Sequence, residues 1–168
     1  MVSMDQNVKT SWSQVENVYQ RRLDLIPNIV ASVKWEANFE QETLIGVVNA
    51  RASATKLNVN VNDAKEMAEF QQSQWQLTQA LWRFLMVTEN YPTLQSNKWF
   101  MDLRVSLEWT ENRITVERQK YNEVVWNYNI FIRRIPNNIV ASLFWFGEKQ
   151  LFESKSWADV APVVDFSK

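Results

Sequence analysis

The fold of this chain is decided by the stretch from Asn97 to Phe146, NKWFMDLRVSLEWTENRITVERQKYNEVVWNYNIFIRRIPNNIVASLFWF. Apolar or neutral residues recur in it at spacings of three and four: Phe100, Leu103, Leu107, Thr110, Ile114, Tyr121, Val125, Tyr128 and Ile132. Such spacing is typical of a helix with one apolar stripe, here about ten turns long and interrupted only at Glu117. The intervening side chains carry both signs of charge and predict a face exposed to water, Glu117 included. The helix therefore needs other helices to cover its stripe.

Composition limits the classes of function. With 168 residues and 46% hydrophobic content the chain is long enough to bury a core. Its 18 basic and 19 acidic side chains give no electrostatic basis for binding nucleic acid. Cysteine and histidine are absent, which excludes disulfides, thiol nucleophiles, imidazole bases and the usual zinc or iron ligands. We expect no cofactor, and a chain that is soluble on its own, because its longest uncharged apolar run is too short to span a membrane.

Two further helices are predicted ahead of this stretch. The first begins near Met4 and carries an apolar stripe in a seven-residue repeat: Val8, Trp12, Val15, Tyr19, Arg22, Ile26, Ile29 and Val33. Pro27 falls within that stripe, and because proline removes a helical hydrogen bond we expect a break or sharp kink there. The next helix would then run from Asn28 to Lys56. Asp63, followed by Glu66, has the spacing to cap another helix that ends at Tyr91-Pro92.

These elements predict an all-α fold. We expect an elongated antiparallel bundle of three to four long helices with a short C-terminal helix. The bundle would occupy residues 1–150, and residues 151–168 would form an extended tail.

An internal repeat links two parts of the chain. Tyr19 to Arg22, Ile26-Pro27-Asn28, Ile29 to Ser32 and Trp35 are echoed by Phe131 to Arg134, Ile135-Pro136-Asn137, Ile139 to Ser142 and Trp145. Arginines ahead of a helix-ending proline complement the negative end of the helix dipole, so the favoured interpretation is a reused helix terminus. The alternative is a basic interaction or anion site formed by Arg21, Arg22, Arg133 and Arg134. For Arg22 alone, the favoured reading is a packed stem whose charged head reaches solvent.

Carboxylates offer one route to chemistry. Glu36, Glu40 and Glu42 could form a metal-binding or enzymatic site in a helical bundle. A ferritin-like dimetal site, however, requires Glu-x-x-His pairs, and the chain has no histidine. The polar pairs Glu16-Asn17 and Glu111-Asn112 are expected to face helix interfaces and to form hydrogen bonds between helices. We therefore favour a chain that is not an enzyme.

Several motifs together identify a family. They are Trp12 to Asn17, Tyr19 to Arg22, Asp24 to Asn28, Glu42 to Leu44, Glu89 to Pro92, Thr110 to Ile114, Tyr121-Asn122, Ile132 to Arg134, Pro136 to Asn138, Phe152-Glu153, Ala161-Pro162 and Asp165-Phe166. In order and with few gaps, they resemble the soluble domain of the LemA family of bacterial membrane proteins.

The resemblance implies a fold and a location. LemA proteins have one N-terminal transmembrane helix followed by an all-helical bundle of uncertain biochemical role. It implies an anchor upstream of Met1, absent from this chain, in the bacterial cell membrane, with the bundle on the cytoplasmic side. No catalytic residue carries over. The expected function is that of a scaffold or protein-interaction module whose partner, oligomeric state and process the residues do not specify.

Tryptophan usage departs from that family. Nine tryptophans accompany only two glycines, and family members carry glycine, or a small residue at Trp82, at the positions of Trp35, Trp75, Trp82, Trp109, Trp145 and Trp157. Three explanations compete: tryptophans that pack a diverged core, an aromatic surface for assembly, or UGA codons that stand for glycine. We favour the third, because an indole that replaces glycine at a tight contact overpacks a bundle.

Overall fold

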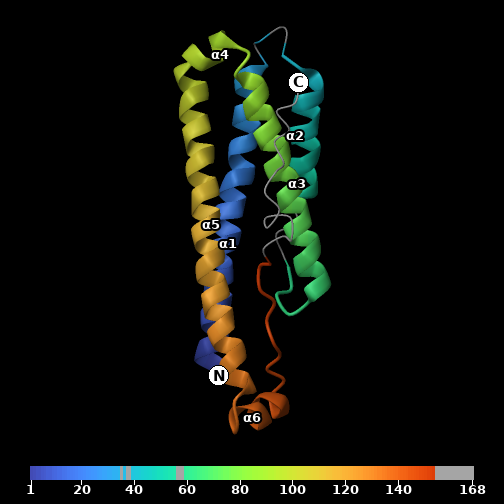
Figure 1. Ribbon diagram of the computed structural model, residues 1–168, viewed down its shortest axis with the longest axis vertical. Coiled ribbons are helices and arrows are strands. Elements are labelled where there is room, and N and C mark those ends of the chain that lie inside the picture. Colours follow the sequence, from blue (N-terminus) through green and yellow to red (C-terminus); the bar gives the residue numbers. More distant parts are fainter. Residues whose placement is uncertain (35, 37–38, 56–58, 154–168) are drawn as a thin grey trace, which may run out of the picture.

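A computed structural model describes residues 1–34, 36, 39–55 and 59–153. Its helices are α1 (Val2–Val33), α2 (Gln41–Ser53), α3 (Ala64–Thr88), α4 (Pro92–Ser96), α5 (Lys98–Arg133) and α6 (Asn137–Leu143) (Figure 1). The part of the chain described here contains no strand. The predicted all-α fold is confirmed, with long antiparallel helices and a short helix near the C-terminal end.

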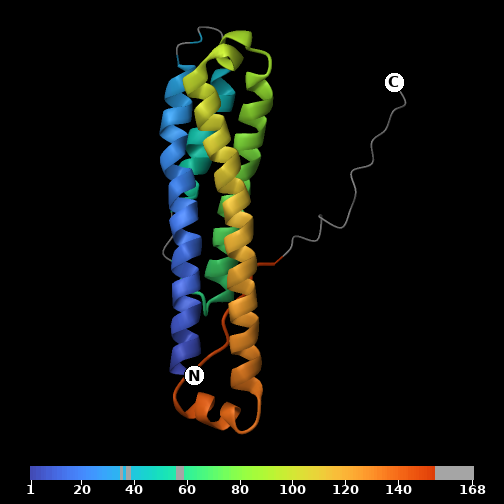
Figure 2. The same cartoon turned by 90° about the vertical axis from the view of Figure 1, so that its left-hand side faces the viewer.

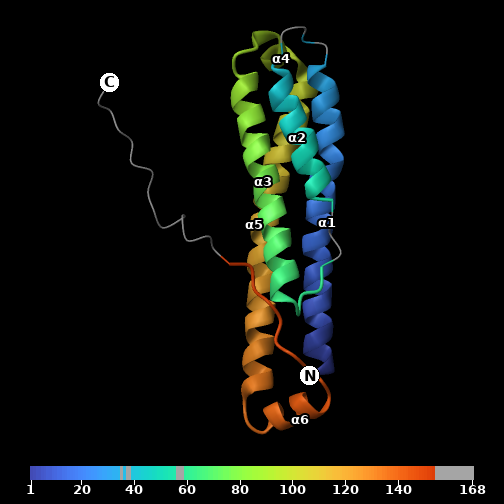
Figure 3. The same ribbon diagram turned by 90° about the vertical axis from the view of Figure 1, so that its right-hand side faces the viewer.

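The long helices pack as two pairs. α1 packs chiefly against α5, and α2 chiefly against α3, while α4 closes the end remote from the N-terminus. Four helices lie together only in that half of the molecule, because α2 and α3 do not reach the other end (Figures 2 and 3). Toward the N-terminus α2 ends first, and the start of α3 still packs on this part of the bundle, where Phe70 contacts Trp12. Beyond it α1 and α5 continue, and the extended segment 147–153 returns along them.

The apolar stripes that the spacing predicts are the buried surfaces. All eight members of the seven-residue repeat on α1 are buried, as are all predicted stripe positions of α5 except Leu103, which is half-buried. The predicted cap of α3 is confirmed, because the Asp63 carboxylate accepts from the backbone N–H groups of Lys65 and Glu66 at 2.8 and 3.2 Å. α1, in contrast, begins at Val2, slightly earlier than expected, and has no side-chain cap.

Glu117 is the exception to the predicted water-exposed face of α5. It is buried, in the gap that the stripe leaves between Ile114 and Tyr121. Arg113 and Lys120 reach its Oε1 at 2.9 and 3.2 Å from the same helix. The expectation that Glu117 is solvated was wrong because these two exposed cations supply the partners that a buried carboxylate needs.

Pro27 neither ends nor breaks the first helix, contrary to the predicted break. α1 runs through it to Val33, and the chain reverses between α1 and α2 rather than near Asn28. Proline leaves the carbonyl of Leu23 without its helical donor. The Nε of Arg51, on α2, donates to that carbonyl at 3.0 Å. A tertiary contact thus replaces the missing hydrogen bond, and the buried Ile26 and Ile29 hold the helix in register.

The second copy of the repeat does end a helix. α5 stops at Arg133, the Ile135–Pro136 peptide bond is cis, and α6 starts at Asn137. α6 lies across the end of the bundle beside the N-terminus (Figure 1). The interpretation of the repeat as one reused terminus therefore holds for Pro136 and was wrong for Pro27.

The segment 147–153 is fixed to α5 by side-chain amides. Asn122 donates to the carbonyl of Phe152 and accepts from its N–H, at 2.9 and 2.8 Å. Asn129, seven residues further on, makes the same pair of bonds with Lys149 at 2.9 and 3.0 Å. Phe152 is buried against Trp12, Phe70 and Tyr121. The first three residues of the predicted tail are thus extended, with Phe152 packed in the core, while residues 154–168 lie outside the described part.

The tryptophans differ in how far they are exposed. Trp12 is buried, whereas Trp82, Trp109 and Trp145 are exposed, and Trp75 is half-buried. The exposed positions do not fit the explanation of a tryptophan-packed core. Trp35 and Trp157 lie outside the described residues.

Trp145 has a backbone that favours glycine. Its φ is 62°, in the left-handed region, and it follows the last turn of α6. The N–H of Phe146 donates to the carbonyl of Ala141 at 2.9 Å, the six-to-one bond of a glycine-terminated helix. This geometry supports the glycine interpretation at position 145.

A candidate binding groove between α3 and α5

Arg22 is the centre of a buried polar network. Its guanidinium Nη1 donates to Thr78 Oγ1 at 2.9 Å and to Glu111 Oε1 at 2.8 Å. Its Nη2 donates to the side-chain oxygen of Gln74. The Arg22 side chain is only 1% exposed, against 30% for Glu111. The expectation that the head of Arg22 reaches solvent was wrong, because acceptors from α3 and α5 converge on it.

Sequence position explains why the network forms. Arg22 occupies an inward place of the seven-residue repeat of α1, so its side chain is directed into the bundle. Gln74 interrupts the apolar stripe of α3 between Phe70 and Leu77 and is buried. Its Nε2 donates to the carbonyl of Ala54, the residue that ends α2, at 3.0 Å. The network therefore connects α1, α3 and α5 with the end of α2, in the part of the bundle where four helices lie together.

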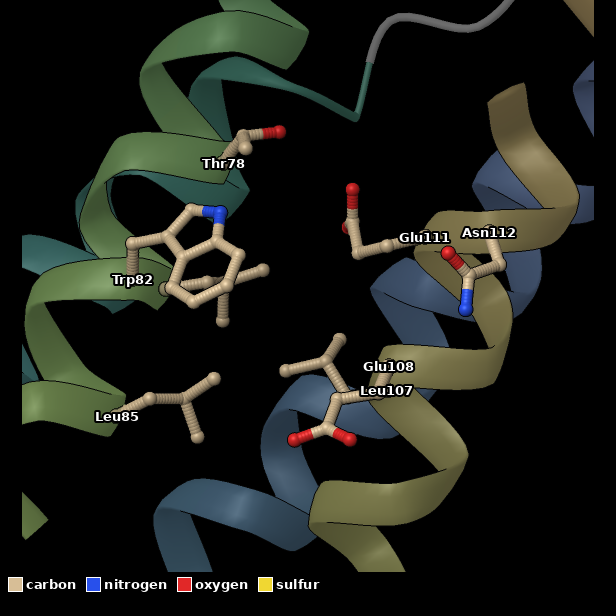
Figure 4. Close-up of a pocket in the computed structure, with 8 residues that line it drawn as sticks. Thr78, Trp82, Leu85, Leu107, Glu108, Glu111 and Asn112 are labelled. Atoms are coloured by element: carbon tan, nitrogen blue, oxygen red, sulfur yellow. The ribbon is translucent and has the colours of Figure 1, made fainter. Parts of the chain in front are cut away.

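A groove opens beside this network. It has a volume of about 270 Å³ and lies between α3 and α5, which face each other across it in Figure 4. Its lining residues are Thr78, Leu81, Trp82, Leu85, Leu107, Glu108, Glu111 and Asn112. The leucines make the wall apolar, and the carboxylates lie on the α5 side (Figure 4).

The polar side chains of the groove differ in whether they already have partners within the protein. Thr78 and Glu111 already bind Arg22. Glu108 forms an exposed ion pair with Arg104 on the same helix, Nε to Oε1 at 3.1 Å, a contact of small energetic value that can exchange partners. Glu108 and Asn112 are thus the polar positions at which an approaching molecule meets an exposed side chain.

The four arginines predicted as an interaction site do not come together. Glu111, which marks the level of Arg22, and Arg133 are 22 residues apart on one helix, about 33 Å at 1.5 Å per residue. Arg21 is exposed and stacks on Trp109, with 4.9 Å from Cζ to the ring centroid. The structure thus places one pair at mid-bundle and the other at its end.

Arg133 and Arg134 are exposed at the end of α5. Arg133 binds both carboxylate oxygens of Glu148, at 2.6 and 2.7 Å. The hydrogen bond and charge of Glu148 raise the pKa of Arg133 above its ordinary value. Arg134 forms no ion pair within the described residues.

Two of the three carboxylates considered for a metal site, Glu36 and Glu40, have separate partners, and Glu42 is exposed in the first turn of α2. Glu36 accepts from Thr93, while Glu40 accepts from Thr43 at 3.0 Å and from Arg83 at 3.4 Å. Among the described residues, no group of three carboxylates forms a cluster suited to a metal ion.

The two polar pairs expected at helix interfaces, Glu16-Asn17 and Glu111-Asn112, are only partly found there. Glu111 forms the expected bond between helices, whereas its neighbour Asn112 is exposed and lines the groove. Glu16 is half-buried, and burial raises the pKa of its carboxyl. Sequence reasoning missed Gln74 and Thr78. The only signal was a glutamine inside an apolar stripe.

Comparison with known proteins identifies the family. The model of the LemA family matches residues 11–166, nearly the whole chain. The chain belongs to the LemA family. Among similar proteins are Magnetosome protein MamQ 1 and MamQ 2 of Paramagnetospirillum magneticum, each 35% identical over 85 residues. MamQ of Magnetospirillum gryphiswaldense is 31% identical over the same length.

These matches cover half of this LemA-family chain and about a third of each relative, 51% and 31%. They therefore support a LemA-like helical protein in the part that aligns. Within the described residues, no helix is both long and apolar enough to cross a membrane.

Proposed function

We propose that this LemA-family protein is a non-enzymatic, membrane-tethered module that binds a helix of a partner protein in the groove between α3 and α5. The observation that carries the proposal is the groove itself. The buried Leu81, Leu85 and Leu107 form its floor, and the exposed Trp82 lies at its edge. The neighbouring hydrogen-bond network holds α3 and α5 on either side of it. An amphipathic helix laid into an apolar groove is a common mode of protein recognition.

Charge defines the partner further. Glu108 lies at the groove and is half exposed, and its bond to Arg104 is of the weak surface type. A lysine or arginine of the partner can replace Arg104 there. We therefore expect a partner helix with apolar residues at helical spacing and a basic residue beside them.

The tether and its side of the membrane rest on the family resemblance. We expect the gene to encode about 20 apolar residues upstream of Met1, with the bundle on the cytoplasmic side of the bacterial membrane. Sequencing upstream of Met1 tests the tether. An in-frame stop codon immediately before a ribosome-binding site placed for Met1 would contradict it.

Site-specific photocrosslinking in cells tests the groove. A photoreactive amino acid at Asn112 should crosslink to a segment of a partner that mass spectrometry maps to a basic amphipathic helix. The photoreactive amino acid placed instead at Trp82 should give an adduct with the same segment. Adding Glu108→Arg with Asn112→Arg should abolish the adduct from position 82 by repelling the partner.

A matched control lies on the same helix. Gln119→Arg with Glu123→Arg makes the same change in charge at the same spacing, three turns further along α5, at exposed positions. It should leave the adduct intact. Adducts lost equally in both double variants, or no adduct from the groove positions, would contradict the proposed binding mode.

A further inference from the structure

At the end of the bundle beside the N-terminus, α6 and the residues next to it expose apolar side chains to solvent. Residues 135–147 contain no charged side chain. Ile135, Ile139, Leu143 and Phe144 are all exposed, by 83%, 68%, 71% and 63%, while Ala141 is the one buried residue of α6. Ile139 and Leu143 are four residues apart on α6 and therefore lie on one face of it, while Ile135 precedes the helix and Phe144 follows it. The four exposed side chains together make this end of the protein apolar.

The shape of this end favours a flat partner. α6 lies across the axis of the rod and forms its end, as all three views show (Figures 1, 2 and 3). Because this apolar surface lies at right angles to the long axis of the bundle, it is better placed to contact a flat surface than to pack along the side of another helix. Met1 and Val2 line a hollow together with Val140 and Phe144, so the N-terminus lies at the same end.

Charge at this end is positive. Residues 1–10 and 129–149 hold four basic side chains (Lys9, Arg133, Arg134 and Lys149) and two acidic ones (Asp5 and Glu148), a net charge of +2, although the whole chain has −1. Both acids are paired, Asp5 with Lys149 and Glu148 with Arg133. Exposed Arg134 is left to meet an anionic group.

We propose that the α6 end binds the surface of a lipid bilayer, with Ile135, Ile139, Leu143 and Phe144 among the upper acyl chains and Arg134 at anionic headgroups. Apolar side chains on one face with basic residues at the border are the features that place a helix in a membrane interface. The inference goes beyond the tether, because it assigns an orientation: the bundle stands upright on the membrane. It uses none of the tryptophans whose identity is in question.

Flotation with lipid vesicles tests this with the chain as it exists, without any anchor. The protein should float with vesicles that contain phosphatidylcholine and phosphatidylglycerol. Ile139→Ser, Leu143→Ser and Phe144→Ser together should reduce the bound fraction at least tenfold. These side chains are exposed, so an unchanged urea midpoint will verify that the triple variant is folded.

Two further variants identify the cause of binding. Val48→Ser, Met86→Ser and Val105→Ser remove three exposed apolar side chains elsewhere and should leave flotation unchanged. Arg134→Gln should weaken binding to vesicles with phosphatidylglycerol and have no effect on pure phosphatidylcholine vesicles.

Three outcomes would overturn the proposal: no flotation of the unaltered chain, equal loss in both triple variants, or a dimer in sedimentation equilibrium that only the α6 variant dissociates. The last would assign the face to a second copy. None of these outcomes bears on the upstream anchor, so failure of this inference and failure of the proposed tether are separable.

Discussion

The two copies of the internal repeat share their motifs and have opposite structures, although Leu23 to Leu25 have no counterpart between Arg134 and Ile135. In the first, Arg22 and Ile26 are buried, and α1 continues through Pro27. In the second, Arg134 and Ile135 are exposed, and the helix has ended before Pro136. The same proline motif thus ends one helix and lies inside another, and the contacts that α1 makes with the surrounding helices support its continuation through Pro27.

The surroundings differ because the bundle is not the same along its length. At the level of Arg22, α1 is surrounded by α2, α3 and α5, which supply Arg51, Gln74 and Glu111. At the level of Arg134 neither α2 nor α3 is present (Figure 3). The first copy therefore finds buried partners, and the second is left to face whatever lies at the end of the molecule.

The largest effect is expected at Arg22. Arg22→Met should lower the free energy of unfolding by about 3–5 kcal/mol, because it leaves Gln74 and Glu111 without their buried donor. Urea denaturation followed by circular dichroism measures it. The matched change in the second copy, Arg134→Met, should have no measurable effect. Equal losses at the two positions would contradict the difference between the copies.

Trp145 provides a smaller effect of opposite sign. Trp145→Gly should raise the free energy of unfolding by about 1 kcal/mol, because it removes the steric cost of a left-handed backbone and little packing is lost at an exposed side chain. Trp109→Gly, inside α5, should lower it by about 1 kcal/mol. Calorimetry of both variants checks the pair. A destabilising Trp145→Gly would contradict a left-handed backbone at that position.

Glu148 allows a comparison of the ion pairs of the two copies. Glu148→Gln removes an exposed pair with Arg133, and we expect no resolvable shift of the urea midpoint. Glu111→Gln, which alters the partner of buried Arg22, should shift the midpoint to lower urea. A larger midpoint shift from Glu148→Gln than from Glu111→Gln would contradict the expectation that the buried pair contributes more to stability than the exposed pair.

A further effect, confined to acid pH, is expected at Asp5. Burial would raise the pKa of Asp5, but the hydrogen bonds and charges of Lys149 and Lys9 together lower it below the ordinary value. A lowered pKa means that the folded state favours the carboxylate, so its stabilising contribution is present above the unfolded pKa, near 3.9, and is lost as the pH falls through the folded value. Asp5→Asn should flatten the fall in stability below about pH 4. An unchanged acid profile would mean that the contact with Lys149 does not contribute.

Much of the fold could be predicted from spacing. The stripe of α5, the repeat of α1 and the cap at Asp63 depend on neighbours within one helix, which the sequence displays directly. The path through Pro27 could not be predicted, because it depends on Arg51, a residue 28 positions from Leu23. The burial of Glu117 was missed because its charge outweighed its position in the stripe.

The candidate groove was less accessible to sequence reasoning. Glu111 and Asn112 were expected at a helix interface, and Arg22 was recognised as the charged member of a stripe. Nothing along the chain indicates that Arg22 contacts Thr78, 56 residues away. The sequence also does not indicate that α3 and α5 leave a groove between them, lined by leucines. Packing between pairs of helices determines both features.

A double-mutant cycle between Pro27 and Arg51 tests the central claim, that a contact from α2 replaces the hydrogen bond that the proline removes. Arg51→Met alone should lower the free energy of unfolding by about 1–2 kcal/mol, the cost of a carbonyl left without a partner. In the Pro27→Ala background, where the helix again supplies a donor to Leu23, the same substitution should cost less than about 0.5 kcal/mol. Equal losses from Arg51→Met in the two backgrounds would contradict the account.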